Sequence, residues 1–291
     1  RDQFSSTSYF HRVDLVYENH EGAWDFLFTP SYRHSFISLA AVDAVNFNLR
    51  FNTFSLRSEI SRRLSQKVRV RFGTKLEAGV ADIFVQAPAP NAIDINDQAI
   101  TTVSSPYTLP SLYSTVTWAV TDNFTLLPGF RFTLYDFIPR DSDARVAPSM
   151  SMDPRLRFLW ELTDDTIIKG GVGEYSQSPP PQVYDGVFGN PRILPEHALH
   201  TSLGVTHQFD YNINLEVTGF FKYLWDLSAP SDALILGSAG NPEPEVFANS
   251  GVGRIYGAEV LLRKELTKNF YGWLSYTLMR SERKPNLNEP Y

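Results

Sequence analysis

The sequence predicts an all-β fold, an antiparallel transmembrane β-barrel domain with about 12 strands. Three observations favour this class. Long stretches alternate between apolar and polar residues, short and long connections alternate along the chain, and most tryptophans lie near the ends of the predicted strands. A strand with one apolar and one polar face separates two different solvents.

The alternation predicts strands of unusual length. It places them near residues 8–18, 23–35, 48–64, 67–86, 108–121, 124–138, 148–162, 166–177, 198–209, 213–227, 255–265 and 270–281. The mean strand of a soluble protein has about 5–6 residues. Fourteen residues at about 3.3 Å each, tilted by about 40°, rise about 35 Å, which exceeds an apolar membrane band of about 25 Å.

The alternation of apolar and polar residues is clearest in three stretches. In 68–80 apolar residues alternate with Arg69, Arg71 and other polar or small residues. The stretch 124–134 alternates as well, although its second face includes Leu127. In 213–226 one register contains Val217, Phe221 and Tyr223, and the other contains Glu216, Thr218 and Lys222. We expect the first register to contact lipid and the second to face the barrel interior.

The connections predict the orientation of the barrel. Short ones lie at 19–22, 65–66, 122–123, 163–165, 210–212 and 267–269, and long ones near 36–47, 87–107, 139–147, 178–197 and 228–254. Outer-membrane barrels have short periplasmic turns and long extracellular loops. We therefore expect the loops 87–107, 178–197 and 228–254 to be extracellular, and the turns Asp122–Asn123 and Asp210–Asn212 to be periplasmic.

The predicted ends of the chain lie on the long-loop side, whereas a complete bacterial barrel has both termini at the periplasm. Residues 1–291 are therefore expected to form one partial barrel domain of a larger barrel. Trp24, Trp118, Trp160 and Trp225 fall in the apolar register near strand ends, as interface tryptophans do, and Trp273 falls in the opposite register.

Composition excludes several other classes. The chain has 26 Lys and Arg against 32 Asp and Glu, a net charge of −6 that disfavours a nucleic-acid partner. There is no cysteine, so disulfides and Cys-based zinc sites are absent, and no apolar run is long enough for a membrane helix. His197 and His200 lie three apart, which on a strand points them to opposite faces, and no metal or other cofactor is predicted.

Several short motifs in the second half resemble the barrel of TonB-dependent receptors. They are Gly173–Pro179, Asn190–Glu196, Asn249–Gly251, Tyr256–Glu259 and Trp273–Thr277, which follow in order at barrel spacing. The resemblance implies a 22-stranded barrel, closed by an N-terminal plug and driven by TonB, that imports a scarce nutrient of the siderophore, vitamin, glycan or peptide class. The implied partners are the outer-membrane lipid bilayer, the protein's own plug and remaining strands, a TonB-type protein and the nutrient.

Candidate binding residues lie in the proline-rich loop 178–197, where Tyr184, Phe188 and Arg192 are best suited to recognise a ligand. The Asn-Pro and Pro-Glu steps of this loop are expected to be structural turn formers. The arginines Arg69, Arg71, Arg131, Arg155 and Arg157 fall in the lumen register. They are expected to pair with carboxylates inside the barrel rather than to bind an anionic ligand.

Three rival functions remain from the sequence alone. A passive porin of about 12–14 strands would lack an upstream plug. An outer-membrane hydrolase would need a catalytic serine, but no hydrolase motif is present, so the sequence favours a protein that is not an enzyme. A soluble all-β binding protein would remain in solution without detergent, which the long two-solvent strands argue against.

Overall fold

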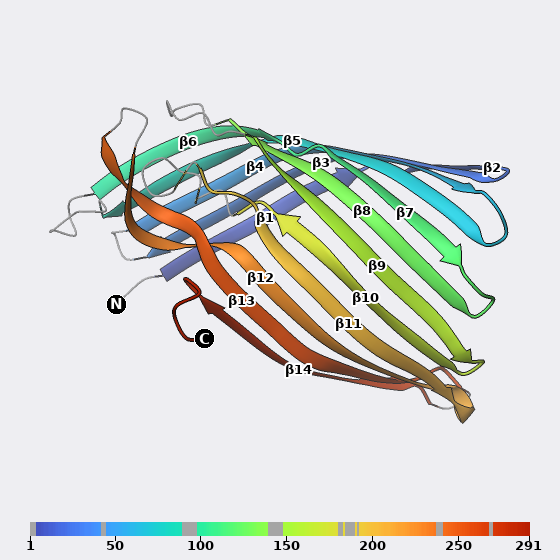
Figure 1. Ribbon diagram of the computed structural model, residues 1–291. Helices are drawn as coiled ribbons and strands as arrows, with labels where there is room; N and C mark the ends of the chain where they lie inside the picture. Colours follow the sequence, from blue (N-terminus) through green and yellow to red (C-terminus); the bar gives the residue numbers. More distant parts are fainter. Residues whose placement is uncertain are drawn as a thin grey trace.

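The computed structural model describes residues 4–41, 45–88, 98–138, 148–179, 183, 190, 192–236, 241–267 and 270–291. Their strands form one antiparallel sheet (Figure 1). The strands are β1 (Phe4–Asp14), β2 (Tyr17–Glu21), β3 (Trp24–Ala41), β4 (Val45–Arg63), β5 (Val68–Pro88), β6 (Gln98–Thr108), β7 (Ser111–Ala119), β8 (Phe124–Phe137), β9 (Ser149–Thr163), β10 (Thr166–Gln177), β11 (Glu196–Phe209), β12 (Ile213–Leu236), β13 (Pro242–Lys264) and β14 (Gly272–Lys284). A 3-10 turn, η3 (Asp210–Asn212), joins β11 and β12. None of the described residues forms a helix that could cross a membrane.

The prediction of an all-β antiparallel fold is confirmed, and the predicted strand 8–18 is divided into β1 and β2. The strands β1 and β2 both pair with β3 in one continuous register. The strands β6 and β7 pair with β5 in the same way, and Pro110 lies between them. Proline has no N–H for the ladder, so the strand is interrupted there although the register continues. The sheet path therefore runs β1-β3-β4-β5-β6-β8-β9-β10-β11-β12-β13-β14.

The predicted loops 36–47, 87–107 and 228–254 were wrong for most of their length. The β3–β4 ladder continues to the pair Ala41 and Val45, and the β5–β6 ladder continues to Pro88 and Gln98. The β12–β13 ladder resumes after irregularities and reaches Leu236 and Pro242. An antiparallel ladder is held by backbone groups, so it extends past the point where the apolar alternation ends. The amphipathic pattern therefore located the part of each strand within the apolar band. It did not show how far the strands extend beyond that band.

The two faces of the sheet differ as the alternation predicts. The register places Val217 beside Val205 and Val260, and Phe221 beside Tyr256, on one face. Val217 is 40% and Phe221 42% exposed. We call this apolar face the outer face and the opposite face the inner face. Contact of the outer face with lipid stays a prediction.

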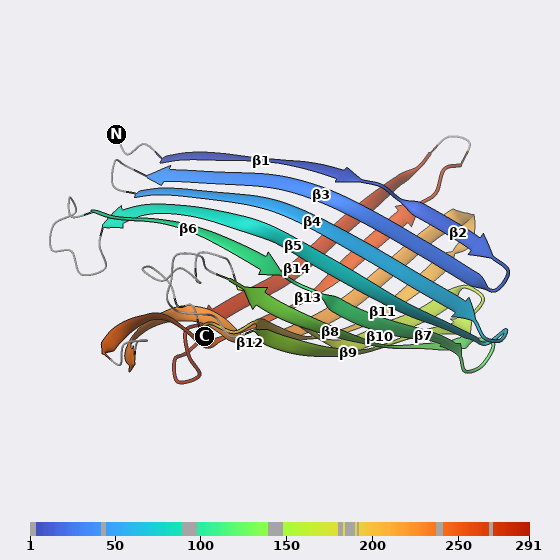
Figure 2. The same cartoon turned by 90° about the horizontal axis from the view of Figure 1, so that it is seen from above.

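The sheet is curled, and Figure 2 shows strands β1–β5 passing over β11–β14. At the end of the strands that bears the long connections, the two halves of the sheet share a hydrophobic core. This core consists of Ala81, Tyr107, Tyr135, Phe137 and Ile193, with Phe51, Leu109 and Phe247 packed against it. Phe247 belongs to β13, whereas most of the cluster belongs to β5, β6 and β8. The upper part of the β12–β13 hairpin therefore reaches across the inner face.

A bend in this hairpin explains how it does so. The β12–β13 register shifts between Leu224 and Leu227 and again between Ser231 and Leu234. Asp226 and Val246 have positive φ values of 54° and 61°. Such values are rare for residues with a side chain, and rarest for a β-branched one. The tertiary packing of Phe247 therefore holds a local conformation that the sequence does not favour.

The two faces make a direct prediction for charge placement in the full-length protein. Replacing Val217 with Arg should lower the free energy of unfolding by about 2–4 kcal/mol, because a charge near the membrane midplane loses its hydration. Replacing its neighbour Thr218 with Arg should have a much smaller effect, since Thr218 lies on the inner face. A reversible unfolding titration in lipid or detergent measures both. Equal losses for the two variants would contradict the assignment of the faces.

Candidate functional site

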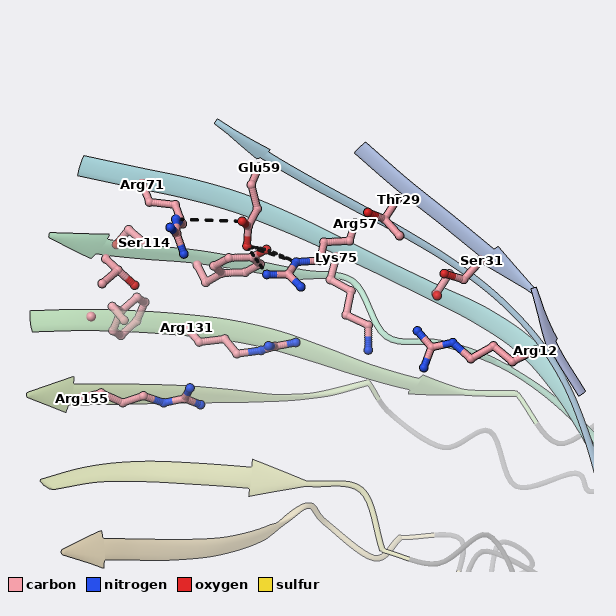
Figure 3. A pocket seen from close by; sticks show the side chains of 15 residues that line it. Arg12, Thr29, Ser31, Arg57, Glu59, Arg71, Lys75, Ser114, Arg131 and Arg155 are labelled. Atoms are coloured by element: carbon pink, nitrogen blue, oxygen red, sulfur yellow. Dashed lines mark hydrogen bonds and ion pairs between the residues drawn. The ribbon is translucent and has the colours of Figure 1, made fainter. Parts of the chain in front are cut away.

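A polar cavity of about 510 Å³ lies on the inner face, at mid-height of the strands. Residues of β1, β3, β4, β5, β7, β8 and β9 line it (Figure 3). Six of its side chains are cationic: Arg12, Arg57, Arg71, Lys75, Arg131 and Arg155. Alternation places these side chains inward because each lies one residue from an outward apolar neighbour, as Arg71 does beside Phe72. In a chain of net charge −6, this concentration of positive charge is a local feature.

Four carboxylates pair with these cations. Glu59 accepts hydrogen bonds from Arg57, at 2.5 Å from Nη2, and lies 4.0 Å from Arg71. Glu77 lies 2.9 Å from Lys75, and Asp14 2.9 Å from Arg12. Asp153 lies 3.7 Å from Arg155. The expectation that lumen arginines pair with carboxylates is therefore confirmed for Arg71 and Arg155, and also for Arg69, which lies 3.7 Å from Asp25.

Arg131 departs from that expectation. Its guanidinium donates hydrogen bonds to Ser111 Oγ at 2.8 Å and to Thr133 Oγ1 at 3.3 Å. It also lies 5.7 Å from the centre of the Tyr113 ring. Among the described residues, no carboxylate is within ion-pair distance of it. Arg131 is thus a permanent charge held only by neutral groups.

Arg155 is also incompletely satisfied. Its guanidinium lies 4.1 Å from the centre of the Tyr175 ring and 3.7 Å from Asp153. Its Nε atom is buried and has no hydrogen-bond partner in the part of the chain that the structure describes. A buried donor without a partner is unfavourable by about 1–3 kcal/mol. The guanidinium is therefore held by the Asp153 carboxylate and the Tyr175 ring, and its Nε is shielded from solvent.

Two tyrosines lie flat over glycines along the wall that bears the cavity. Tyr113 of β7 covers Gly73 of β5, and its hydroxyl donates to Glu59 of β4 at 2.7 Å. Six residues along each strand, Tyr107 of β6 covers Gly79 of β5, and its hydroxyl lies 2.6 Å from Thr53 Oγ1 of β4. Each tyrosine thus joins three neighbouring strands through its side chain. We call these two contacts the tyrosine clamps. The clamp of Tyr107 is the upper one, and the clamp of Tyr113 is the lower one, which holds the carboxylate that pairs with Arg57.

Of the three binding residues predicted from sequence, the structure describes only Arg192. Tyr184 and Phe188 lie outside the described residues. Arg192 is exposed, and its backbone N–H donates to Asn190 Oδ1 at 2.9 Å. The structure does not bring Arg192 into the cavity.

The motif residues around Arg192 hold the loop base together. Asn190 Nδ2 donates to the carbonyl of Phe247 at 2.7 Å. Glu196 is buried and accepts hydrogen bonds from Ser228 N at 3.0 Å and Ser228 Oγ at 2.8 Å. Asn249 exchanges two hydrogen bonds with the backbone of Leu194, at 2.8 and 3.0 Å. These contacts support the structural role expected for the loop motifs.

Sequence reasoning identified the inward register of Arg131 and Arg155 but not the cavity. The missing information was the pairing of strands far apart in the chain. One sequence signal could have indicated the contact between β5 and β7. Gly73 and Tyr113 both fall in the inward register, and a glycine leaves room for a large side chain on a neighbouring strand. In the described residues, no three His, Cys, Asp or Glu side chains come together as a metal site.

Comparisons with known proteins place the chain in a family. Residues 1–290 match the family described as TonB dependent receptor-like, beta-barrel. No curated protein matches the sequence.

Solved structures share the fold at low sequence identity. The ferric yersiniabactin uptake receptor FyuA from Yersinia pestis has a TM-score of 0.68 and 14% identity, over 97% of this chain and 44% of that one. The pyoverdine receptor FpvA from Pseudomonas aeruginosa PAO1 has a TM-score of 0.69 and 12% identity, over 96% and 45%. The copper transporter OprC has a TM-score of 0.65 and 13% identity, over 94% and 46%. The chain thus spans less than half the length of each.

The upper tyrosine clamp predicts an unusual sensitivity to alanine. A Cβ atom at Gly79 would lie 2.4 Å from the carbonyl oxygen of Asn52 and 2.9 Å from the hydroxyl of Tyr107. Gly79→Ala should therefore lower the free energy of unfolding by about 1–3 kcal/mol through overpacking. The matched control is Gly219→Ala, where the nearest atom is 4.0 Å away, and it should change stability by less than about 0.5 kcal/mol. The same unfolding titration compares them, and an unaffected Gly79→Ala protein would refute the clamp.

Proposed function

Because this chain belongs to the TonB-dependent receptor β-barrel family, we propose that it is part of an outer-membrane receptor that binds and imports a scarce nutrient. The observation that carries the proposal is the family match over residues 1–290, together with a sheet whose outer face is apolar and whose inner face is charged. Such a division suits a wall between lipid and an aqueous lumen. The nutrient class remains that implied by the family: a siderophore, vitamin, glycan or peptide.

In this proposal, other parts of the full-length protein and a coupling protein complete the transporter. The chain would form one section of a larger barrel, and its own plug, its remaining strands and a TonB-type protein would complete the transporter. The solved structures that share its fold include a ferric yersiniabactin uptake receptor, a pyoverdine receptor and a copper transporter, so iron complexes and metal ions are suitable first ligands to test. Within this proposal Tyr184, Phe188 and Arg192 remain the candidate recognition residues of the loop 178–197.

A receptor is a better reading than an enzyme or a passive porin. Receptors of this family bind and transport a ligand. The sequence motifs include no hydrolase nucleophile paired with a base. A porin would pass solutes without energy, whereas a receptor of this family requires a coupling protein. The two are therefore distinguished by energy dependence.

Uptake in cells tests the proposal. A strain that expresses the full gene product should accumulate the nutrient only when an energised TonB system is present. Deletion of the gene should abolish high-affinity growth on that nutrient, and complementation should restore it. Uptake that persists without TonB would favour the porin, and a serine-directed probe that labels the protein would favour the hydrolase.

The proposed orientation is tested by labelling. The chain contains no cysteine, so single substitutions introduce unique thiols within it. In intact cells a membrane-impermeant maleimide should label Asn241→Cys, in the β12–β13 connection, and should not label Asp122→Cys, in the β7–β8 turn. Permeabilised cells provide the control, since both positions are exposed and should then react. The opposite pattern in intact cells would invert the topology.

A further inference from the structure

We propose that the outer face binds one glycerophospholipid near the short turns of the sheet. The lipid phosphate contacts Arg62, the primary ammonium of its headgroup contacts Glu21, and one acyl chain fills a hollow in the apolar surface. This site faces away from the lumen, so no part of the protein that fills the barrel competes for it. The inference rests on the membrane location of the outer face, which is part of the proposed function.

The hollow has a volume of about 910 Å³ and is lined by residues of β2, β3, β4, β5 and β7, which lie side by side in the sheet (Figure 1). Ser58 of β4 pairs with Thr74 of β5 in the outer register. Larger apolar side chains surround these two: Phe26, Phe28, Ile60, Phe72 and Leu112. The hollow therefore exists because two short side chains interrupt a surface of bulky ones.

An acyl chain matches the walls of this hollow. Phe28, Phe72 and Leu112 are all exposed in the described sheet, so their apolar surface is available to a lipid. The volume lies within the range of about 300–1,000 Å³ that is typical of small-molecule sites. A flexible hydrocarbon chain gains dispersion contacts on several sides in such a depression, which it does not gain on a flat wall.

A row of three side chains lies between the hollow and the short turns. Glu21 of β2 pairs with Trp24 of β3, which pairs with Arg62 of β4. The Arg62 guanidinium lies 4.6 Å from the centre of the Trp24 ring. Within the part of the chain that the structure describes, neither Arg62 nor Glu21 has an oppositely charged group at ion-pair distance. The row thus presents two opposite charges on either side of an aromatic ring.

The row and the hollow form one continuous surface. The Trp24 ring stacks on Phe26, with centres 6.3 Å apart, and Phe26 lines the hollow. Arg62 lies four residues from Ser58 on the same face of β4, which is about 13 Å along the strand. A lipid can therefore place its phosphate at the row while its chain extends into the hollow.

The charges of the row match a zwitterionic headgroup. A guanidinium pairs with phosphate oxygens, and a carboxylate accepts hydrogen bonds from a primary ammonium. Neighbouring strands lie about 4.8 Å apart, so the backbones at Glu21 and Arg62 are separated by about 10 Å, and their side chains can reach the two charges of one headgroup. A headgroup with a phosphate alone would leave Glu21 unpaired.

The depth of Arg62 in the membrane also agrees with a headgroup contact. Arg50 and Arg62 both lie in the outer register of β4, and apolar Phe54, Leu56 and Ile60 lie between them. Twelve residues span about 40 Å along a strand, or about 30 Å at a tilt of about 40°. This distance exceeds an apolar band of about 25 Å, so each arginine lies near an interface.

The experiment uses the full-length protein in detergent, titrated with phosphatidylethanolamine and read out by native mass spectrometry. One lipid should be retained. Arg62→Gln should raise its Kd about fivefold or more, the loss expected for a partly exposed charge-assisted contact. Thr74→Leu should raise the Kd about threefold or more without changing any charge, because it fills the hollow.

Two further variants make the test specific. Glu21→Gln should abolish the preference for phosphatidylethanolamine over phosphatidylglycerol with the same acyl chains. The matched control is Arg50→Gln, which removes an equal charge from the same register of β4. Arg50 also lies over an aromatic ring, 6.0 Å from the centre of Phe36, but it does not line the hollow. This control should leave the Kd of phosphatidylethanolamine unchanged.

Each other outcome overturns a defined part of the proposal. Absence of a retained lipid, or an equal loss in Arg50→Gln, removes the site. Tighter retention of phosphatidylglycerol by the unmodified protein removes the headgroup assignment, and an unchanged Kd in Thr74→Leu removes the hollow. TonB-dependent uptake by a protein that retains no lipid refutes this site alone. Lipid retention in a protein without such uptake refutes only the proposed transport.

Discussion

The requirement that every backbone polar group find a partner governs this structure. In a lipid environment no water is available to an exposed N–H or C=O, so strands must pair along their whole length. The strands between β3 and β13 meet this requirement by pairing on both sides, even where Pro110 removes a donor between β6 and β7, whereas β1 and β14 pair on one side only in the described sheet. Because the ladder depends on backbone groups, side chains are free to differ between the two faces. The apolar outer register and the charged inner register both follow from that freedom.

The inner face uses the same freedom to collect charge. A guanidinium facing lipid near the membrane midplane would be strongly unfavourable. The arginines that line the cavity all lie on the inner face, whereas Arg62, which pairs with Trp24, lies in the outer register near a strand end. Several find carboxylates nearby: Arg57 pairs with Glu59 on its own strand β4, and Arg71 of β5 pairs with Glu59 across the two strands. Arg131 differs from these residues, since hydroxyls of Ser111 and Thr133 hold it in place of a carboxylate.

The sequence predicted the two-faced strands and their order because alternation is a local property of the chain. It placed the hairpin turns well, including Asp210–Asn212, because turn residues act locally too. It failed where distant segments decide the outcome. The extensions of β5, β6, β12 and β13 depend on partner strands, and the positive φ of Val246 depends on the packing of Phe247 against a remote cluster. The cavity was missed for the same reason, since its members are joined only by strand pairing.

The tyrosine clamps have a mechanical consequence. Each clamp links β4 and β5 to the divided strand β6–β7 through a ring that lies along the sheet, and the two lie six residues apart. Sliding of β5 against either neighbour would have to break both hydroxyl contacts at once. This part of the wall should therefore respond to stress as one stiff panel. Deformation of the wall would concentrate instead in strands outside the two clamps, so the lumen would change shape there while β4, β5 and β6–β7 kept their register.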